Sequence, residues 1–170
     1  MVSTVVTLRR ARADDPAEIA AVHDCAWREA YRGVIPGREL ERMIARRGPR
    51  WWGAAVARGA SIAVVDFDES VAGYVSYGRN RLPGREAGEI FELYLAPEFQ
   101  GLGFGRQLFA AAAKDLAAHG FDECVVWALA DNERALAFYA HLGGRIAHRT
   151  QERFGVELLD RVGFRFALPA

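Results

Sequence analysis

The sequence has no excess charge of either sign and no long apolar run. Its 22 basic residues balance 22 acidic ones, so the chain has no overall field that would hold a nucleic acid or an anionic membrane. No apolar stretch approaches the ~18 residues of a membrane-spanning helix. Residues 1–15 also lack the apolar block and cleavage site of a secretory signal. We therefore expect a cytoplasmic protein with neither nucleic-acid nor membrane partners.

Cysteine and histidine are also scarce. The two cysteines, Cys25 and Cys124, fall on an apolar helix face and in an apolar strand, which is typical of reduced core thiols. No cysteine or carboxylate stands at ligand spacing from the histidines, so we expect no metal. The serine hydrolase motif GxSxG is absent as well. The four histidines are dispersed along the chain: His23, His119, His141 and His148.

What the chain does have is enough apolar character for a core. Of its 170 residues, 51% are hydrophobic, and no polar linker or internal repeat divides them, which predicts a single domain over residues 1–170. Helical spacing predicts helices over 15–32, 37–46, 106–119 and 133–142. Strand patterns cover 4–10, 61–67, 71–79, 89–95, 124–130, 145–149 and 162–168. This order predicts the α/β class, a mixed sheet flanked by helices.

Two connections in this scheme follow from turn residues and polarity. Gly48 and Pro49 are expected to break the chain after the second helix. Residues 151–160 are expected to connect the last two strands. The tryptophans that follow the break, Trp51 and Trp52, fit either core packing or an aromatic acceptor pocket.

The stretch from Glu89 to Phe109 predicts a binding site. Residues 89–95 carry apolar side chains on both parities, which is typical of a central strand covered on both faces. Glycines at 101, 103 and 105 allow positive φ and close approach of a ligand to the backbone. A helix follows at once, so its positive dipole end faces the same loop. This arrangement suits an anion, most naturally a phosphate or pyrophosphate.

Two well-known phosphate loops fit poorly. A Walker A loop needs Lys and then Ser or Thr after its last glycine, where this chain has Arg106 and Gln107. A dinucleotide fingerprint needs a third glycine, but its position is taken by Leu108 or Arg106, depending on the register. Asp131 follows the next apolar strand, where a ribose-binding acid would stand, so a nicotinamide-binding alternative stays open.

A third loop matches in place. Gln100, Gly103 and Gly105 fit the pattern Q or R, x, x, G, x, G or A of the GNAT N-acetyltransferases, which this sequence resembles. The likeness continues through the strand 124–130, Asn132 and a helix containing Phe-Tyr. It thus covers residues 89–144, and 26–36 also look like the family's entry helix. One departure is Gly144, where the family usually has an aromatic residue.

The resemblance implies a GNAT fold and acetyl-CoA as cosubstrate. In this family the pantetheine arm bonds the backbone of the central strand, which here is Leu93, Tyr94 and Leu95. Gln100 would orient the glycine loop, and Asn132 would bond the pantetheine arm besides capping its helix. The pyrophosphate would be bound by backbone N–H groups of Gly101, Gly103, Phe104, Gly105 and Arg106.

The catalytic groups also follow from the resemblance, with structural alternatives beside them. Tyr139 matches the tyrosine that protonates the leaving thiolate, although its apolar helix would also suit a core residue. Glu92 and Glu89 are candidates for the base, because a carboxylate in a central strand is costly unless paired or useful. Their odd separation places them on opposite faces unless a bulge intervenes. Glu92 is nearer the cofactor end and is preferred, while an ion pair with an arginine is the alternative for either.

We therefore expect an acyl-CoA-dependent N-acetyltransferase in which a primary amine attacks the thioester of acetyl-CoA directly. The acceptor, a small-molecule or peptide amine, is not identified by any pattern in the sequence. Two alternatives stay open, a non-catalytic acyl-CoA or nucleotide-binding module and an NAD-dependent oxidoreductase. The second is disfavoured because the chain is short for a dinucleotide fold with a substrate domain. Homodimerisation stays open as well.

Overall fold

The computed structural model describes residues 5–82 and 86–170. Within them the helices are α1 (Pro16–Tyr31), α2 (Gly37–Arg46), α3 (Pro49–Ala57), α4 (Phe104–Ala118) and α5 (Glu133–His141), with a short 3-10 helix, η1 (Pro97–Phe99). The strands are β1 (Val6–Arg10), β2 (Ser61–Phe67), β3 (Ser70–Arg79), β4 (Gly88–Leu95), β5 (Glu123–Leu129), β6 (Arg145–Phe154) and β7 (Glu157–Ala167). They form one sheet in the order β1-β2-β3-β4-β5-β7-β6.

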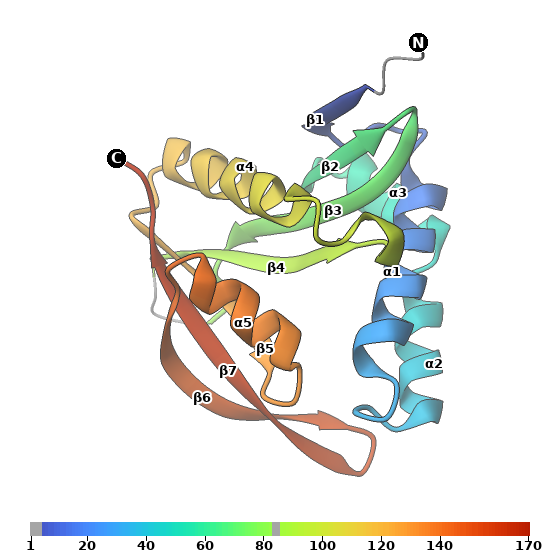
Figure 1. Cartoon of the computed structure of the whole chain (residues 1–170), viewed down its shortest axis with the longest axis vertical. Helices are drawn as coiled ribbons and strands as arrows, with labels where there is room; N and C mark the ends of the chain where they lie inside the picture. The colour runs from blue at the N-terminus through green and yellow to red at the C-terminus, as the bar shows by residue number, and fades with distance from the viewer. Residues whose placement is uncertain (1–4, 83–85) are drawn as a thin grey trace.

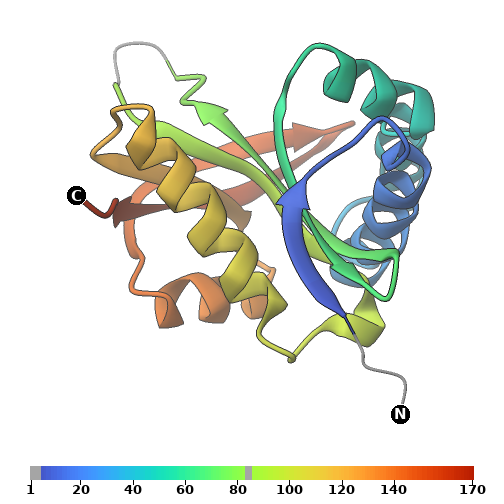
Figure 2. The same cartoon turned by 90° about the horizontal axis from the view of Figure 1, so that it is seen from above.

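Helices cover both faces of this sheet (Figure 1). Figure 2, seen from above, places α4 and α5 on one side and α1 and α3 on the other. On the first side Leu108, Ala112 and Leu116 recur at helical spacing and are buried in the main core, as an amphipathic helix requires. On the second, Ile19 and Trp52 pack against β2 and β3. The predicted α/β class with a mixed, helix-flanked sheet is confirmed.

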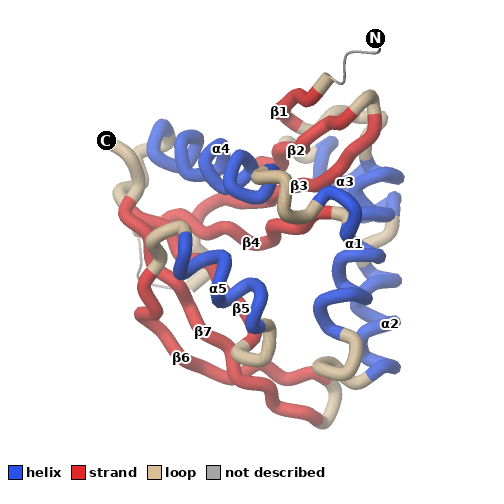
Figure 3. The backbone as a smooth tube through the Cα atoms, in the orientation of Figure 1, coloured by secondary structure: helices blue, strands red, loops and turns tan. Residues whose placement is uncertain are grey.

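The centre of the sheet is where the strands part (Figure 3). Every other neighbouring pair is antiparallel, but β4 and β5 are parallel. Among the described residues, their pairing is confined to Gly88–Ile90 on β4 and Cys124–Val126 on β5. Beyond Ile90 the two strands diverge, so the backbone edge of β4 that faces β5 becomes available to a ligand.

A bulge lies at the same point of β4. Ser76 of β3 pairs with Glu92, whereas the next residue, Tyr77, pairs with Ile90. Phe91 is therefore an additional residue in β4, as in other β-bulges. It shifts the alternation of side chains for the rest of the strand.

The structure differs from the sequence-based prediction at two connections. The expected break after α2 is present, since this helix ends at Arg46, but a helix that was not predicted follows at once: Gly48 is the N-cap and Pro49 opens α3, which is the position where proline suits a helix. Residues 151–160 are not a long connection, because β6 and β7 pair as far as Phe154 and Glu157. Most side chains of this hairpin end are exposed, so a one-sided apolar pattern was missing. Thr4, the expected start of the first strand, lies outside the described residues.

Candidate active site

A cavity of about 690 Å³ opens where β4 leaves β5. The end of β4, the glycine loop, the first turn of α4, α5 and one side of α1 surround it. Of the residues predicted to bind a cofactor, nine line it: Leu93, Tyr94, Leu95, Gln100, Gly101, Gly103, Gly105, Arg106 and Asn132. Residues far apart in the sequence are thus brought to one place.

The loop depends on its glycines. Gly101 and Gly103 have φ of 77° and 84°, in the left-handed region where a side chain is strained. Gly105 allows close packing of α4 on α5, since a Cβ there would lie 3.2 Å from the ring of Phe138. The first intrahelical bond of α4 runs from Gln107 N–H to the Gly103 carbonyl. The preceding N–H groups of the first turn are therefore available to an anion.

Phe104 differs from the other predicted loop residues because it is not part of the cavity lining. Its side chain is buried in the core, where its ring lies near those of Phe67 and Phe99. Only its backbone N–H, at the first position of α4, is suited to the predicted role.

Gln100 ties the loop to two elements. Its Nε2 donates to the carbonyl of Leu95, at 3.3 Å, and to Oε2 of Glu29 on α1, at 2.9 Å. Across the cavity, Asn132 is the N-cap of α5, and its Oδ1 accepts from the N–H of Ala135 at 3.1 Å. The loop and the start of α5 are thus both fixed by side-chain amides.

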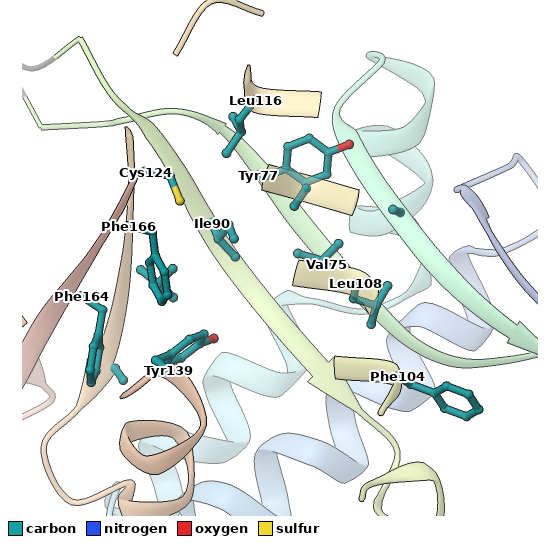
Figure 4. Close-up of a cluster of buried hydrophobic side chains, with 14 of the residues drawn as sticks. Val75, Tyr77, Ile90, Phe104, Leu108, Leu116, Cys124, Tyr139, Phe164 and Phe166 are labelled. Atoms are coloured by element: carbon teal, nitrogen blue, oxygen red, sulfur yellow. The ribbon is translucent and has the colours of Figure 1, made fainter. Parts of the chain in front are cut away.

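Tyr139 lies on the α5 side of the cavity. Its ring is buried beside Phe164 and Phe166, with the hydroxyl directed towards β4 (Figure 4). Burial raises the pKa of this phenol, so it stays protonated at neutral pH, as a proton donor must. The ring of Phe166 also explains Gly144: a Cβ at that position would lie 2.5 Å from it.

The two glutamates do not lie on opposite faces, because the bulge at Phe91 intervenes. Ile90 and Leu93 belong to the core under α4. Side chains of neighbouring strand residues point to opposite faces, so Glu89, next to Ile90, and Glu92, next to Leu93, both point to the α1 side. Neither lines the cavity. Glu89 is 2% exposed and pairs with Arg81, with Oε1 and Nη2 2.7 Å apart. This is the ion pair foreseen as its structural alternative.

Glu92 lies in a buried polar cluster instead. It is 9% exposed, and the Tyr74 hydroxyl donates to its Oε2 at 3.3 Å. Its Oε1 is 3.9 Å from His23 Nε2 and 3.6 Å from Arg47 Nη2. Burial raises the pKa of Glu92, while Arg47 and Tyr74 act in the opposite direction. A carboxylate with a raised pKa is well suited to accept a proton near neutral pH.

Sequence reasoning missed His23 and Arg47 as neighbours of Glu92. His23 is fully buried, and burial lowers its pKa to about 4, so the imidazole is neutral at pH 7. It stacks on Trp27 of the same helix. Its place on the apolar stripe of α1, four residues before Trp27, was the available signal.

Two features are absent from the described residues. Residues 5–82 and 86–170 contain no group of three or more His, Cys, Asp or Glu side chains that could hold a metal ion. None of their helices is long and apolar enough to cross a membrane.

Comparison with known proteins identifies the family to which this architecture belongs. Residues 27–143 match the Acetyltransferase (GNAT) family. The chain is 33% identical to Uncharacterized N-acetyltransferase YuaI of Bacillus subtilis over 92% of its length and 90% of that protein's. It is 30% identical to a mycothiol acetyltransferase of a Nocardioides species over 81% of its length, but it spans only 49% of that protein.

Solved structures agree in fold. PaiA N-acetyltransferase of Thermoplasma acidophilum, in complex with coenzyme A, superposes with a TM-score of 0.76 at 18% identity, over 92% of this chain and 98% of that one. The acetyltransferase yncA of Salmonella typhimurium, described as putative and solved with acetyl-CoA, gives 0.71 at 21% identity, over 98% and 95%. With two thirds of its sequence matched and its architecture shared, the chain belongs to the Acetyltransferase (GNAT) family.

Proposed function

We propose that this acetyltransferase binds acetyl-CoA in the cavity and transfers the acetyl group to a primary amine by direct attack. The observation that carries the proposal is the position of the cavity. It joins the unpaired edge of β4 to the N-terminus of α4, which supplies backbone hydrogen bonds at one end and an anion site at the other. Solved relatives of the same fold contain coenzyme A or acetyl-CoA.

The residues present fit such a cosubstrate. A volume of about 690 Å³ is within the usual range of ligand sites, roughly 300 to 1,000 Å³. The amides of a pantetheine arm would bond the backbone of residues 93–95, and Asn132 would bond the arm from the opposite side. The pyrophosphate would take the N–H groups of residues 101–106, each such contact contributing about 0.3–1 kcal/mol or more when partly buried.

The proposed reaction needs one base and one acid. The acceptor's ammonium gives a proton to the Glu92 carboxylate, and the free amine nitrogen attacks the thioester carbonyl carbon. A C–N bond forms and the C–S bond breaks, leaving a thiolate that takes the proton of the Tyr139 hydroxyl, while the second proton lost by the amide nitrogen restores that hydroxyl. Glu92 and Tyr139 approach from opposite sides of the gap between β4 and β5, which matches an acceptor and a cofactor that enter from different faces. Glu89, held by Arg81, is given no chemical step.

A non-catalytic acyl-CoA-binding module is the second candidate, and one observation favours it. Glu92 is nearly buried and does not line the cavity, so a proton acceptor in contact with the acceptor amine requires access from the α1 side. Such a module would keep the loop and its ligand but would release no thiol.

The first test is thermal unfolding with acetyl-CoA, CoA, NAD and ATP in parallel. A ligand at about a hundred times its dissociation constant adds ~2.7 kcal/mol, and we expect this for acetyl-CoA and CoA alone. Stabilisation by NAD or ATP only, or by none of the four, would refute the assignment of the cavity.

The second test is release of free thiol with a panel of small-molecule and peptide amines. We expect turnover with at least one amine, and a loss of roughly 10²-fold or more in kcat for Tyr139→Phe, the lower range for a positioned acid. Binding of CoA without thiol release for any amine would support the non-catalytic module instead.

A further inference from the structure

On the α1 side, Glu92 lies beside a partly exposed cation, Arg47. This residue is the C-cap of α2, directly before α3, and its side chain is 32% exposed. Its guanidinium lies over the ring of Trp51, 3.8 Å from the centroid, and Nη2 is 3.6 Å from the Glu92 carboxylate. Trp51 is itself 38% exposed. Arg47 therefore bridges a surface ring and a buried carboxylate.

The other groups that face Glu92 leave Arg47 as its main cation. From α1 comes His23, which is uncharged at neutral pH because burial lowers its pKa to about 4. From β3 comes the neutral hydroxyl of Tyr74. Arg81, which follows β3, also acts on Glu92, but its guanidinium is bonded to Glu89.

The contact between Arg47 and Glu92 is loose. Charge-assisted N–H to carboxylate bonds usually measure about 2.7–2.9 Å, as Arg81 and Glu89 do at 2.7 Å, whereas Arg47 stands 3.6 Å away. Stacking on Trp51 is a second favourable interaction that does not depend on Glu92. Arg47 can thus leave the carboxylate while its guanidinium stays over the ring.

We propose that Arg47 is a built-in competitor of the acceptor: its guanidinium takes the cation position beside Glu92, and the ammonium of a cationic primary amine replaces it. The proposal rests on the proposed function only in giving Glu92 the role of proton acceptor. The exchange keeps a cation beside a buried carboxylate at every stage, which avoids the cost of an unpaired buried charge. It also selects amines that arrive charged over neutral or anionic compounds.

A binding experiment tests this without any turnover. n-Butylammonium chloride is titrated into the CoA-saturated protein at constant ionic strength, and the indole N–H signal of Trp51 is followed by NMR. We expect Arg47→Gln to bind the probe about fivefold more tightly than wild type, equivalent to ~1 kcal/mol. Arg42→Gln is the matched control, because Arg42 also lies on α2, is 60% exposed and pairs with Glu39. Equal or weaker binding by Arg47→Gln would overturn the proposal.

Kinetics give a second readout that a merely structural arginine would not move. For an amine found in the thiol assay, Arg47→Gln should lower KM about fivefold and leave kcat within about twofold, measured above the acidic limb of the pH profile. Because Arg47 lowers the pKa of Glu92, its removal should also move that limb to higher pH. Arg47→Lys should restore the limb, and a limb unchanged in Arg47→Gln would contradict the contact.

The two proposals fail in different ways. If no amine releases thiol from the wild-type protein, the acetyltransferase mechanism fails, while the butylammonium titration still decides the role of Arg47. If Arg47→Gln does not fold, Arg47→Lys replaces it in the titration. A lysine is more flexible and cannot keep the planar stacking on Trp51, so we expect intermediate affinity, and affinity weaker than wild type would count against competition.

Discussion

The two sides of the central gap are built in different ways. On the α4 side the proposed cofactor site consists mostly of backbone groups, positioned by Gly101, Gly103 and the diverging β4. On the α1 side the surroundings of Glu92 are side chains brought together from different elements, among them His23 and Arg47. A site made of backbone groups depends on a contiguous pattern of residues, whereas a site made of side chains from different elements leaves no such pattern in the sequence. For this reason the sequence revealed the first site and concealed most of the second.

The largest effect is expected at Glu92. Glu92→Gln removes the proposed base and should lower kcat by about 10²–10⁴-fold, with acetyl-CoA binding unchanged because the side chain does not line the cavity. Glu89→Gln is the matched control, which weakens an ion pair but should leave kcat within a few-fold. Steady-state kinetics and thermal shifts measure both. If Glu92→Gln retained activity, Glu92 would have no role in the reaction, and the α1 side would not supply the base as proposed.

The next effect concerns stability on the α1 side. Trp52 is fully buried against Tyr74, so Trp52→Ala should cost about 3–5 kcal/mol. Trp51→Ala should cost less than ~1 kcal/mol, because its ring is partly exposed and contacts only the edge of the core through Trp52, besides the Arg47 guanidinium. Chemical denaturation measures the difference. If the two variants lost similar amounts of unfolding free energy, Trp51 would contribute to the core as much as Trp52 does.

His23 should make the α1 side sensitive to acid. Its folded pKa of about 4 lies below the ordinary 6.5, so the unfolded chain binds the proton first, and stability is lost as pH falls from about 6.5 to 4. The full shift corresponds to about 3 kcal/mol. Glu92 acts oppositely, because its raised pKa favours the folded state as it protonates. The unfolding free energy should therefore increase less with pH between about 4 and 6.5 in His23→Gln than in wild type, and parallel curves would show that His23 does not titrate in this range.

The smallest effect tests the α4 side. Gly103→Ala places a Cβ at φ 84°, which should cost about 1–2 kcal/mol of unfolding free energy and weaken CoA binding. Gly37→Ala is the control, since it opens α2 in equally open space but without positive φ. Calorimetric titration with CoA compares the two variants. Unimpaired binding by Gly103→Ala would argue that side chains, not backbone, position the phosphate.

Much of the fold could be predicted because apolar periodicity is local. The strands before and after the glycine loop and the stripe on α4 all follow from residues a few positions apart. Helix α3 was missed because Gly48 and Pro49 resemble a break, although the same pair is also a favourable helix start. The β6–β7 hairpin was shortened because its outer half is exposed on both faces, so no alternation marks it.

The candidate site was predictable only in part, for a related reason. Gln100 and the loop glycines lie in one short segment, and the structure brings them to the same cavity as Asn132 and Tyr139. Arg47 is 45 residues from Glu92 by their numbers, and no periodicity connects them. Their proximity depends on how α2 and α3 pack on the sheet, which a single sequence does not state.

Phe91 has a consequence that resembles a shift of reading frame. A strand sorts its residues by parity, and the additional residue resets the parity of everything after it. If Phe91 took a regular place in the ladder, Leu93 and Leu95 would turn towards α1, and Glu92 would face the proposed cofactor. Deleting Phe91 would instead leave these side chains on their present sides, because Ile90 and Glu92 already pair with the adjacent residues Tyr77 and Ser76. The bulge, as much as residue identity, assigns a carboxylate to the side of the proposed amine.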